Sequence, residues 1–336
     1  MRSFRKITFI TLVAVYLLIL VGGVVRSTGS GMGCPDWPKC FGSWVPPSSV
    51  NDLPANYKEI YAGHREKKNH RFAKYLSLLG MKETAAKILN DPTVLQEAEF
   101  NPTKTWIEYL NRVVGVIIGL LIFAVFVSSL KFRRFDRRLT IIAFLSFLMV
   151  GFQGWIGSFV VSTNLTPWTI TLHMFLALVI VAMLIYWYHA AGDERGLSSP
   201  GAFWWLIAAM VTLMIQIMVG TQVREEIDAV GAVAAREEWI DHLGIAYLFH
   251  RSFSWIVLLL HVGLILKLRK TEGVKVFPLT LILLILGTIL TGLGMAFFAV
   301  PAFLQPVHLL LATVTFGMQF LLLLKLNRKE KTVAIQ

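Results

Sequence analysis

Long apolar runs alternate along the chain with short polar segments. Each run is close to the ~20 residues that a helix needs to cross about 30 Å of hydrocarbon. The pattern predicts an all-α fold, a polytopic membrane protein with eight transmembrane helices. The predicted spans are residues 7–25, 106–130, 139–161, 168–189, 203–222, 243–266, 277–299 and 304–324.

Composition supports this prediction and excludes a soluble domain. Of the 336 residues, 56% are hydrophobic and only 15% are charged. The formal charge of +12 would suit a nucleic-acid partner, but the basic residues stand in bands between the apolar runs, as membrane anchors do. The expected partner is therefore the lipid bilayer and not nucleic acid. The first run follows basic residues like a signal peptide, yet no small-residue cleavage site follows it, so we expect it to stay as a helix.

The basic bands predict the orientation. Short segments rich in Lys and Arg, at residues 2–6, 131–138, 267–275 and 325–331, fall on one side if every run spans the membrane. That side is expected to be cytoplasmic, which places both termini inside and the long 26–105 segment outside a cell (inner) membrane.

The two halves of the sequence resemble each other. "VGGVVR" (21–26) matches "VGTQVR" (219–224), "EYLNRVVG" (108–115) matches "LFHRSFSW" (248–255), and "TPWTITLHMFLAL" (166–178) matches "LQPVHLLLAT" (304–313). A parallel repeat of a four-helix unit explains these matches. We therefore predict two pseudo-symmetric four-helix bundles, an N-terminal half at 1–190 and a C-terminal half at 191–336.

The repeat places two polar residues of each half at similar depth, within about two turns of the outer helix ends. These residues are Asn111 and His173 in the first half, and His250 and His308 in the second. Two imidazoles on facing helices of a bundle can ligate a haem iron from both sides, and hydrogen bonding between helices is the alternative. His261 lies near the face of His250, where it either serves a second haem or packs between helices.

Several of these motifs together resemble the haem A synthases of the terminal-oxidase assembly pathway. The specific elements are "GGVVRSTGSGMGCPDWPKC", "IEYLNRVVG", "TLHMFLAL", "FHRSFSW" and "PVHLLLAT". The resemblance covers most of the chain except the insertion at 43–105, which has helical character and could cap the N-terminal site. It implies an enzyme, an oxygen-dependent oxidoreductase that converts haem O to haem A by oxidising the C8 methyl to a formyl group.

The resemblance also implies site residues. In that family the C-terminal half holds a haem (heme) b through two histidines, which match His250 and His308. The N-terminal half takes haem O as substrate, with ligand positions that match Asn111 and His173. An important glutamate matches Glu108, three residues before Asn111 on the same helix face, where it would serve in catalysis; pairing with Arg112 at the rim is the alternative.

This sequence departs from the family at Asn111, where many relatives have a histidine. A neutral amide is a poor ligand for haem iron, so either His173 alone ligates, or His64 or His70 substitutes. Four arginines form two repeat-related pairs near the outer ends, where they either bind haem propionates or anchor the helices. They are Arg26 with Arg224, and Arg112 with Arg251.

The only cysteines, Cys34 and Cys40, lie in one loop on the predicted outer side. That side is oxidising, and two prolines limit the intervening "PDWPK", so we expect a disulfide; two free thiols are the alternative, and the spacing disfavours a metal site. Such a disulfide could be structural, or it could take part in redox exchange.

Two other functions compete with haem A synthesis. A cytochrome b that passes electrons across the bilayer would need ligands near both faces. The only inner-side or mid-helix candidates are His189 and His261, and they have no repeat partners. A transporter would explain the parallel repeat but not the four polar positions at one depth. The expected reaction partners are haem O, molecular oxygen and an electron donor, and a complex with haem O synthase or the terminal oxidase is an open possibility.

Overall fold

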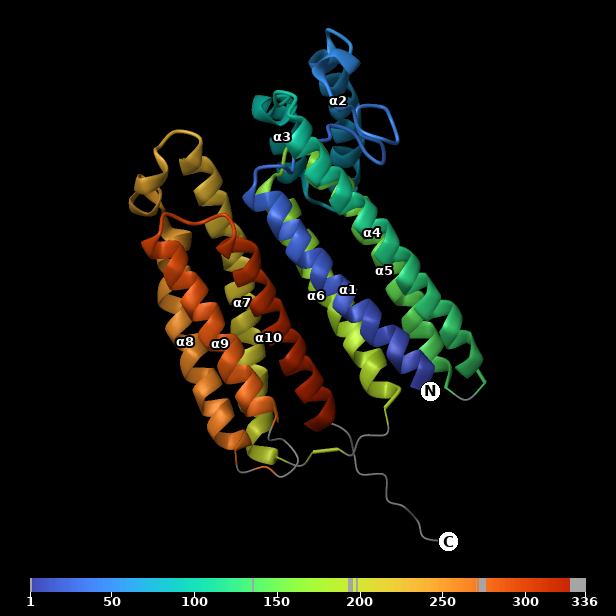
Figure 1. The fold of residues 1–336 in the computed structure, drawn as a ribbon, viewed down its shortest axis with the longest axis vertical. Coiled ribbons are helices and arrows are strands. Elements are labelled where there is room, and N and C mark those ends of the chain that lie inside the picture. Colours follow the sequence, from blue (N-terminus) through green and yellow to red (C-terminus); the bar gives the residue numbers. More distant parts are fainter. Residues whose placement is uncertain are drawn as a thin grey trace.

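Figure 1 shows the fold of the protein as a computed structural model, which describes residues 2–134, 136–192, 196, 197, 199–269, 271 and 276–326. Within these ranges, eight helices are long and apolar enough to cross a membrane, which confirms the prediction of a multi-pass all-α protein. Parts of the basic segments at 131–138, 267–275 and 325–331 lie outside the described residues. The long helices are α1 (Arg2–Ser27), α4 (Pro102–Ser129), α5 (Arg137–Ser162), α6 (Pro167–Ala190), α7 (Pro200–Gly231), α8 (Ile245–Leu268), α9 (Val276–Phe297) and α10 (Leu304–Leu326).

Shorter helices lie in the connections. Two α-helices, α2 (Tyr57–Leu78) and α3 (Lys82–Asn90), belong to the insertion. Single 3-10 turns are η1 (Val50–Asp52), η2 (Pro92–Leu95), η3 (Leu130–Phe132), η4 (Arg236–Glu238) and η5 (Ile240–His242).

Local sequence explains where several long helices begin. Proline stands in the first turn of α4, α6 and α7, where its missing N–H costs no helical hydrogen bond. At α4 the Asn101 side chain also accepts a hydrogen bond from the Lys104 N–H, at 3.0 Å. The helix therefore starts four residues before the apolar run and includes Glu108.

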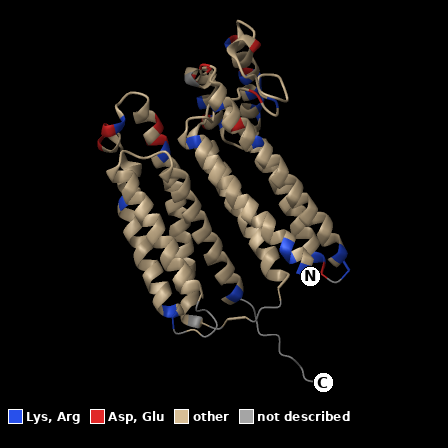
Figure 2. Cartoon of the chain, in the orientation of Figure 1, with Lys and Arg blue, Asp and Glu red and all other residues tan. Residues whose placement is uncertain are grey.

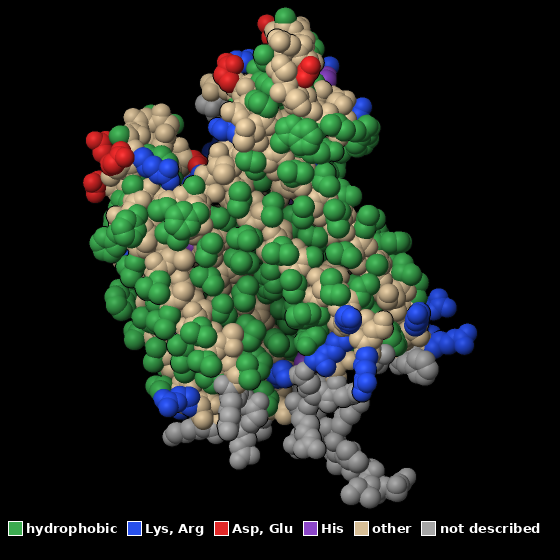
Figure 3. Space-filling model, viewed as in Figure 1, with side chains coloured by type: hydrophobic (Ala, Val, Ile, Leu, Met, Phe, Trp, Pro, Cys, Tyr) green, Lys and Arg blue, Asp and Glu red, His purple; other side chains and the backbone are tan. Residues whose placement is uncertain are grey.

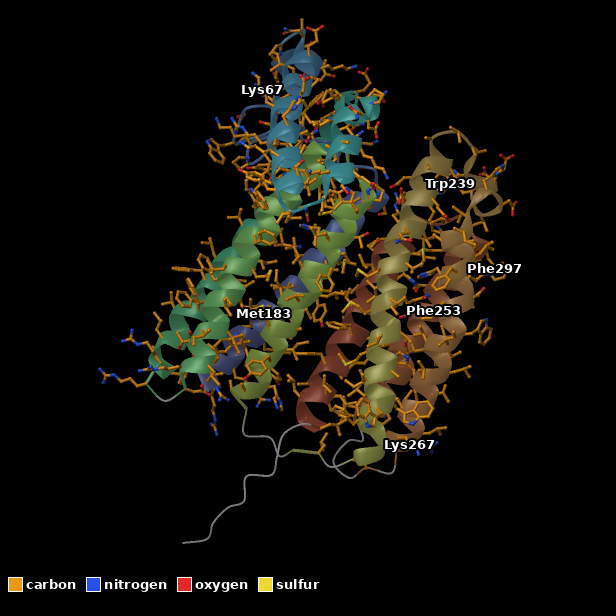
Figure 4. The ribbon with its side chains drawn as sticks, turned by 180° about the vertical axis from the view of Figure 1, so that it is seen from behind. Lys67, Met183, Trp239, Phe253, Lys267 and Phe297 are labelled. Carbon is orange, nitrogen blue, oxygen red and sulfur yellow. A yellow bond between two sulfur atoms is a disulfide. The ribbon has the colours of Figure 1, made fainter. Side chains whose placement is uncertain are left out.

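The long helices form two groups of four, α1 with α4–α6 and α7–α10 (Figure 1). Where the groups meet, a Cβ on Gly23 of α1 would lie 2.7 Å from the Cβ of Pro306 in α10. At the repeat-related place, the hydroxyls of Thr171 in α6 and Thr221 in α7 lie 2.6 Å apart. Small residues and hydroxyl pairs are the usual way to bring membrane helices close together. Side chains of both groups, including Phe253 labelled in Figure 4, pack on one shared core.

The outer surface suits a bilayer. Lys and Arg gather at the two ends of the long helices (Figure 2), while the surface between the ends is covered by hydrophobic side chains (Figure 3). Exposed apolar residues on every long helix, such as Leu120, Leu259 and Leu290, would be unfavourable in water but not in lipid. We call the end that carries residues 28–101 the insertion end.

The same turn joins α5 to α6 and α9 to α10. Asn164 and Leu165 have φ of 50° and 60°, and the equivalent Ala299 and Val300 have 50° and 53°, a left-handed conformation that such side chains seldom adopt. In each turn the second of these residues donates its N–H to a carbonyl five positions earlier, at 2.8 and 2.9 Å. Two turns with the same uncommon backbone are consistent with a duplicated unit.

The insertion folds onto the N-terminal group. Lys68 of α2 donates to the Ser158 carbonyl at 3.0 Å, Asn69 donates to the Ser162 carbonyl at 2.8 Å, and the ring of Phe72 stacks on that of Phe159 with centroids 3.9 Å apart. Burial, together with the charge of Arg112, lowers the pKa of Lys68 to about 8. Helix α2 therefore lies at the insertion end of α5, close to the Arg112 side chain.

A buried ion pair fixes the path of the insertion. Arg65 of α2 is 2% exposed and pairs with Glu97 at 2.8 Å. Its guanidinium also donates to the carbonyls of Val94 and Gln96, at 3.0 and 3.1 Å. Because a buried charge needs a partner and further hydrogen bonds, this pair ties the 94–97 segment to α2.

Candidate functional site

The rings of His250 in α8 and His308 in α10 face each other at the insertion end of the C-terminal group. Their centroids are 6.3 Å apart and their planes are inclined by 59°. Two imidazole nitrogens that share one metal ion at about 2.0 Å each are about 4 Å apart, and their ring centres lie further back. The separation therefore fits a pair of axial ligands to one haem iron.

Hydrogen bonds hold the ring of His308 and the backbone of His250. Thr291 Oγ1 lies 2.9 Å from Nδ1 of His308, which leaves the Nε2 of that ring for another partner. The Gln216 side chain donates to the carbonyl of His250 at 2.8 Å. A contact such as that of Thr291, to the second ring nitrogen, fixes the orientation of a metal-ligating imidazole and commonly changes metal affinity by about 10- to 100-fold. Among the described residues, Nδ1 of His250 has no such partner.

Each of three histidines lies against a glycine of a neighbouring helix. A Cβ built on any of these glycines would be 3.3 Å from the imidazole Cε1 and 3.8 Å from Nδ1, the same values each time. We call each such place a glycine notch, because the missing side chain gives the ring its room. The pairs are His173 with Gly157, His250 with Gly220, and His308 with Gly292.

A prediction follows for the notch in α7. Gly220→Val should push the His250 ring aside and weaken haem b binding about tenfold, equivalent to about 1.4 kcal/mol. The measurement is the haem b absorbance per chain during haem titration of the purified protein. The control is Gly22→Val at the matching position of α1, where a Cβ would meet no atom within 4 Å in the part of the chain that the structure describes. Equal haem b affinity in the two variants would contradict the notch interpretation.

In the N-terminal group, the fourth position of the repeat has no histidine. Asn111 of α4 stands there, and its Oδ1 is buried without a hydrogen-bond partner, as is Nδ1 of His173. The Gln153 side chain donates to the His173 carbonyl at 2.9 Å, as Gln216 does for His250. The backbone of His173 is therefore held as that of His250 is, but among the described residues its Nδ1 lacks the partner that Thr291 gives to His308.

Glu108 and Arg112 hold the disulfide loop on α4. The Cys34–Cys40 disulfide is present, with S–S 2.02 Å, as predicted. Glu108 is 4% exposed; its Oε2 accepts the Cys34 N–H at 2.8 Å, and its Oε1 pairs with Arg112. Arg112 further donates to the carbonyls of Asp36, Lys39 and Cys34, at 2.6, 2.9 and 3.0 Å. Glu108 and Arg112 thus bind the backbone of the loop, and both residues lie within one helical turn of Asn111.

The other three arginines have different surroundings. Arg26 of α1 and Arg224 of α7 both form ion pairs with Asp228, and Arg224 also donates to Gln305 and to the Arg26 carbonyl. They therefore join the two groups of helices. Arg251 is exposed, and its guanidinium lies 5.8 Å from the centre of the Tyr247 ring.

The two histidines of the insertion that could replace the ligand missing at Asn111 do not contact the ring of His173. His64 and His70 are both exposed, and His64 packs edge-on against Tyr61 of its own helix, with centroids 5.8 Å apart. Among the ring contacts of the described residues, neither pairs with His173. Contacts of Lys68, Asn69 and Phe72 hold α2 in this position. The substitution that the sequence left open is thus not made in the structure.

His261 has a structural environment. Its side chain is fully buried, Nδ1 lies 2.7 Å from the Val257 carbonyl, and Nε2 lies 2.9 Å from Nε2 of Gln319 in α10. Both ring nitrogens are therefore occupied by protein atoms. This arrangement agrees with packing between helices and disfavours a second haem at His261.

The sequence interpretation missed the notches and the cross-group acid, Asp228. A signal for the notches exists, because Gly157 precedes His173 by 16 residues and Gly292 precedes His308 by the same number. Asp228 has no acidic counterpart in the first half, where Ser30 stands at the matching position. No pattern in the sequence pointed to it.

Comparison with known proteins agrees with this site. The model of the family described as cytochrome oxidase assembly protein, COX15-CtaA, matches residues 5–320. Several similar proteins are named Heme A synthase, among them the following three. That of Shewanella oneidensis is 25% identical over 288 residues, 82% of this chain and 76% of its own. That of Nitrosospira multiformis is 29% identical over 222 residues (63% and 55%), and that of Methylorubrum extorquens is 25% identical over 322 residues (87% and 78%).

The family match extends across both groups of helices, from the start of α1 to the last turns of α10. It includes the disulfide loop, the insertion and all four positions of the repeat. The chain therefore belongs to the COX15-CtaA family of cytochrome oxidase assembly proteins, the family of the haem A synthases that its motifs resemble.

Proposed function

We propose that this protein is a membrane oxidoreductase that converts haem O to haem A by oxidising the C8 methyl to a formyl group. Two successive oxygen-dependent hydroxylations and loss of water from the geminal diol would complete the change. The relatives named Heme A synthase support this proposal. The observation that carries it is the His250–His308 pair, whose 6.3 Å centroid separation fits axial haem ligation.

In this proposal the C-terminal half, residues 191–336, holds haem b through His250 and His308. When bound, that group supplies a centre for electron transfer. Gly220 and Gly292 give the two rings room, and Thr291 holds Nδ1 of His308 so that Nε2 can face the iron. The residues thus set the orientation of both ligands before the group binds.

The N-terminal half, residues 1–190, is proposed to take haem O, with His173 as the ligand and Asn111 at the opposite position. Glu108 is the proposed catalytic residue. Each of its carboxylate oxygens has a partner, Cys34 N–H and Arg112, which fixes the carboxylate one turn from Asn111. A negative charge held there would stabilise positive charge that develops on the reacting methyl.

The arginine side chains at the insertion end, and the segments that cover it, suit a haem with propionates. Arg251 is exposed and lies next to His250 on α8, so it is the arginine best placed to donate hydrogen bonds to a propionate. Arg26 and Arg224 would do so only by sharing their contacts with Asp228. Arg112 is occupied by the disulfide loop, which with α2 covers the N-terminal half. We propose that this end is extracytoplasmic and that both termini are cytoplasmic.

The reaction needs molecular oxygen and an electron donor, and both are proposed partners. A transient complex with the enzyme that makes haem O, or with the terminal oxidase that receives haem A, would limit the release of free haem into the bilayer. The apolar surface between the two charged ends leaves wide areas for such contacts (Figure 3).

Co-expression with a source of haem O tests the proposal. Extracted haems should contain haem A and a hydroxylated intermediate, and Glu108→Gln should lower both at least tenfold while the haem b spectrum stays unchanged. A membrane-inserted protein that binds haem b but yields neither product would contradict the proposal. That outcome would favour an electron-transfer cytochrome b, which His261 supports poorly because both its ring nitrogens are occupied.

A further inference from the structure

The glycine notches differ in what fills them. Three contain an imidazole, at the same 3.3 and 3.8 Å from the position of a Cβ. The fourth glycine of the repeat is Gly22 in α1, which matches Gly220 in α7. A Cβ on Gly22 would have no atom of the described residues within 4 Å. By the repeat, Gly22 therefore stands where Gly220 gives His250 its room, and no side chain of the described residues reaches that place.

The residue that would fill this notch is Asn111. In the repeat it matches His250, and its side chain is shorter than that of a histidine. Its Oδ1 is buried and has no hydrogen-bond partner. A buried polar atom without a hydrogen-bond partner is unfavourable, and a ligand that hydrogen-bonds to the amide would offset that cost. Oδ1 and Nδ2 of an asparagine can exchange places by rotation, so the amide can turn a donor to such a ligand.

The opposite ligand is intact. His173 keeps its own notch at Gly157 and the hydrogen bond from Gln153 to its carbonyl. His64 and His70 are exposed on α2, so no imidazole of the insertion replaces the missing one. An amide is a poor ligand for iron. A haem held by His173 would therefore have protein on one axial side and an open space at Gly22 on the other.

We propose that this space between Gly22 and Asn111 is a binding position for a small neutral diatomic ligand of the iron, with the Asn111 amide as its hydrogen-bond donor. The inference rests on the proposed function, since it requires haem at His173. The C-terminal half differs, because His250 and His308 occupy both axial sides. The two halves of one repeat thus provide one closed and one open haem site.

Carbon monoxide is the probe, applied to the full-length protein in detergent, loaded with haem and reduced. The wild-type protein should give one CO difference band, lost completely in His173→Ala. Asn111→His should fill the notch and abolish the band while haem remains bound.

Two further variants separate the effect of filling the open space from the effect of the hydrogen bond that Asn111 donates. Gly22→Leu should reduce CO affinity at least tenfold without loss of haem, because the side chain enters the open space. Asn111→Leu should keep CO binding but raise the C–O stretching frequency, because the donor is gone. An unchanged stretching frequency would show that the amide does not contact the ligand and would overturn its assignment as donor.

The outcomes distinguish this inference from the proposed function. Haem bound at His173 that does not react with CO, in wild-type protein whose haem content falls in His173→Ala, would overturn the open position alone. Wild-type protein without haem at His173 would overturn both the inference and the haem O site on which it rests.

Discussion

Replacing His250 or His308 with alanine should remove the haem b spectrum completely. The two rings fit the two axial positions of one iron. Each lies in a glycine notch, and Thr291 also holds Nδ1 of His308. With one ligand gone, the group loses one of the two bonds that fix it between α8 and α10. The measurement is the reduced-minus-oxidised spectrum of the purified membrane protein.

His261→Ala is the control, because it removes a fully buried imidazole from α8, the helix that carries His250. It should destabilise the protein by about 1–3 kcal/mol, since Gln319 and the Val257 carbonyl lose their partner. The haem b spectrum should remain. Loss of that spectrum from a folded His261→Ala protein would contradict our assignment and revive the electron-transfer cytochrome.

Arg112→Ala should destabilise the N-terminal half by about 3–5 kcal/mol, because it leaves the Glu108 carboxylate buried without its countercharge. The same change removes three hydrogen bonds to the carbonyls of Asp36, Lys39 and Cys34 and so releases the disulfide loop. Thermal unfolding in detergent measures the loss of stability, and the rate of reduction of the Cys34–Cys40 bond measures the release of the loop.

Arg251→Ala is the repeat-related control. Arg251 is exposed and contacts the Tyr247 ring, so its removal should change the free energy of unfolding by no more than about 0.5 kcal/mol. Arg112→Lys should fall between the two alanine variants, because it keeps the charge but not the planar fork of donors. Equal destabilisation by Arg112→Ala and Arg251→Ala would show that the ion pair with Glu108 contributes little.

Some site features could be predicted from residue positions alone. The repeat paired Asn111 with His250 and His173 with His308, and the structure brings His250 and His308 together. The disulfide was predicted from a short loop with two prolines, and it is present. The arginines were harder to interpret, because a guanidinium near a helix end suits a propionate, a lipid headgroup or a protein carbonyl equally well.

The sequence by itself determined the eight spans, the family and the repeat. The bilayer requires helices of a fixed apolar length, and duplication leaves matching residues at matching distances along the chain, so both can be read without coordinates. Only the tertiary structure decided which side chains meet: Arg112 on the disulfide loop, α2 on α5, three imidazoles in glycine notches, and Gly22 facing open space. These contacts join segments far apart in the sequence, and whether a notch is filled depends on distances of a few ångströms that helix packing alone sets.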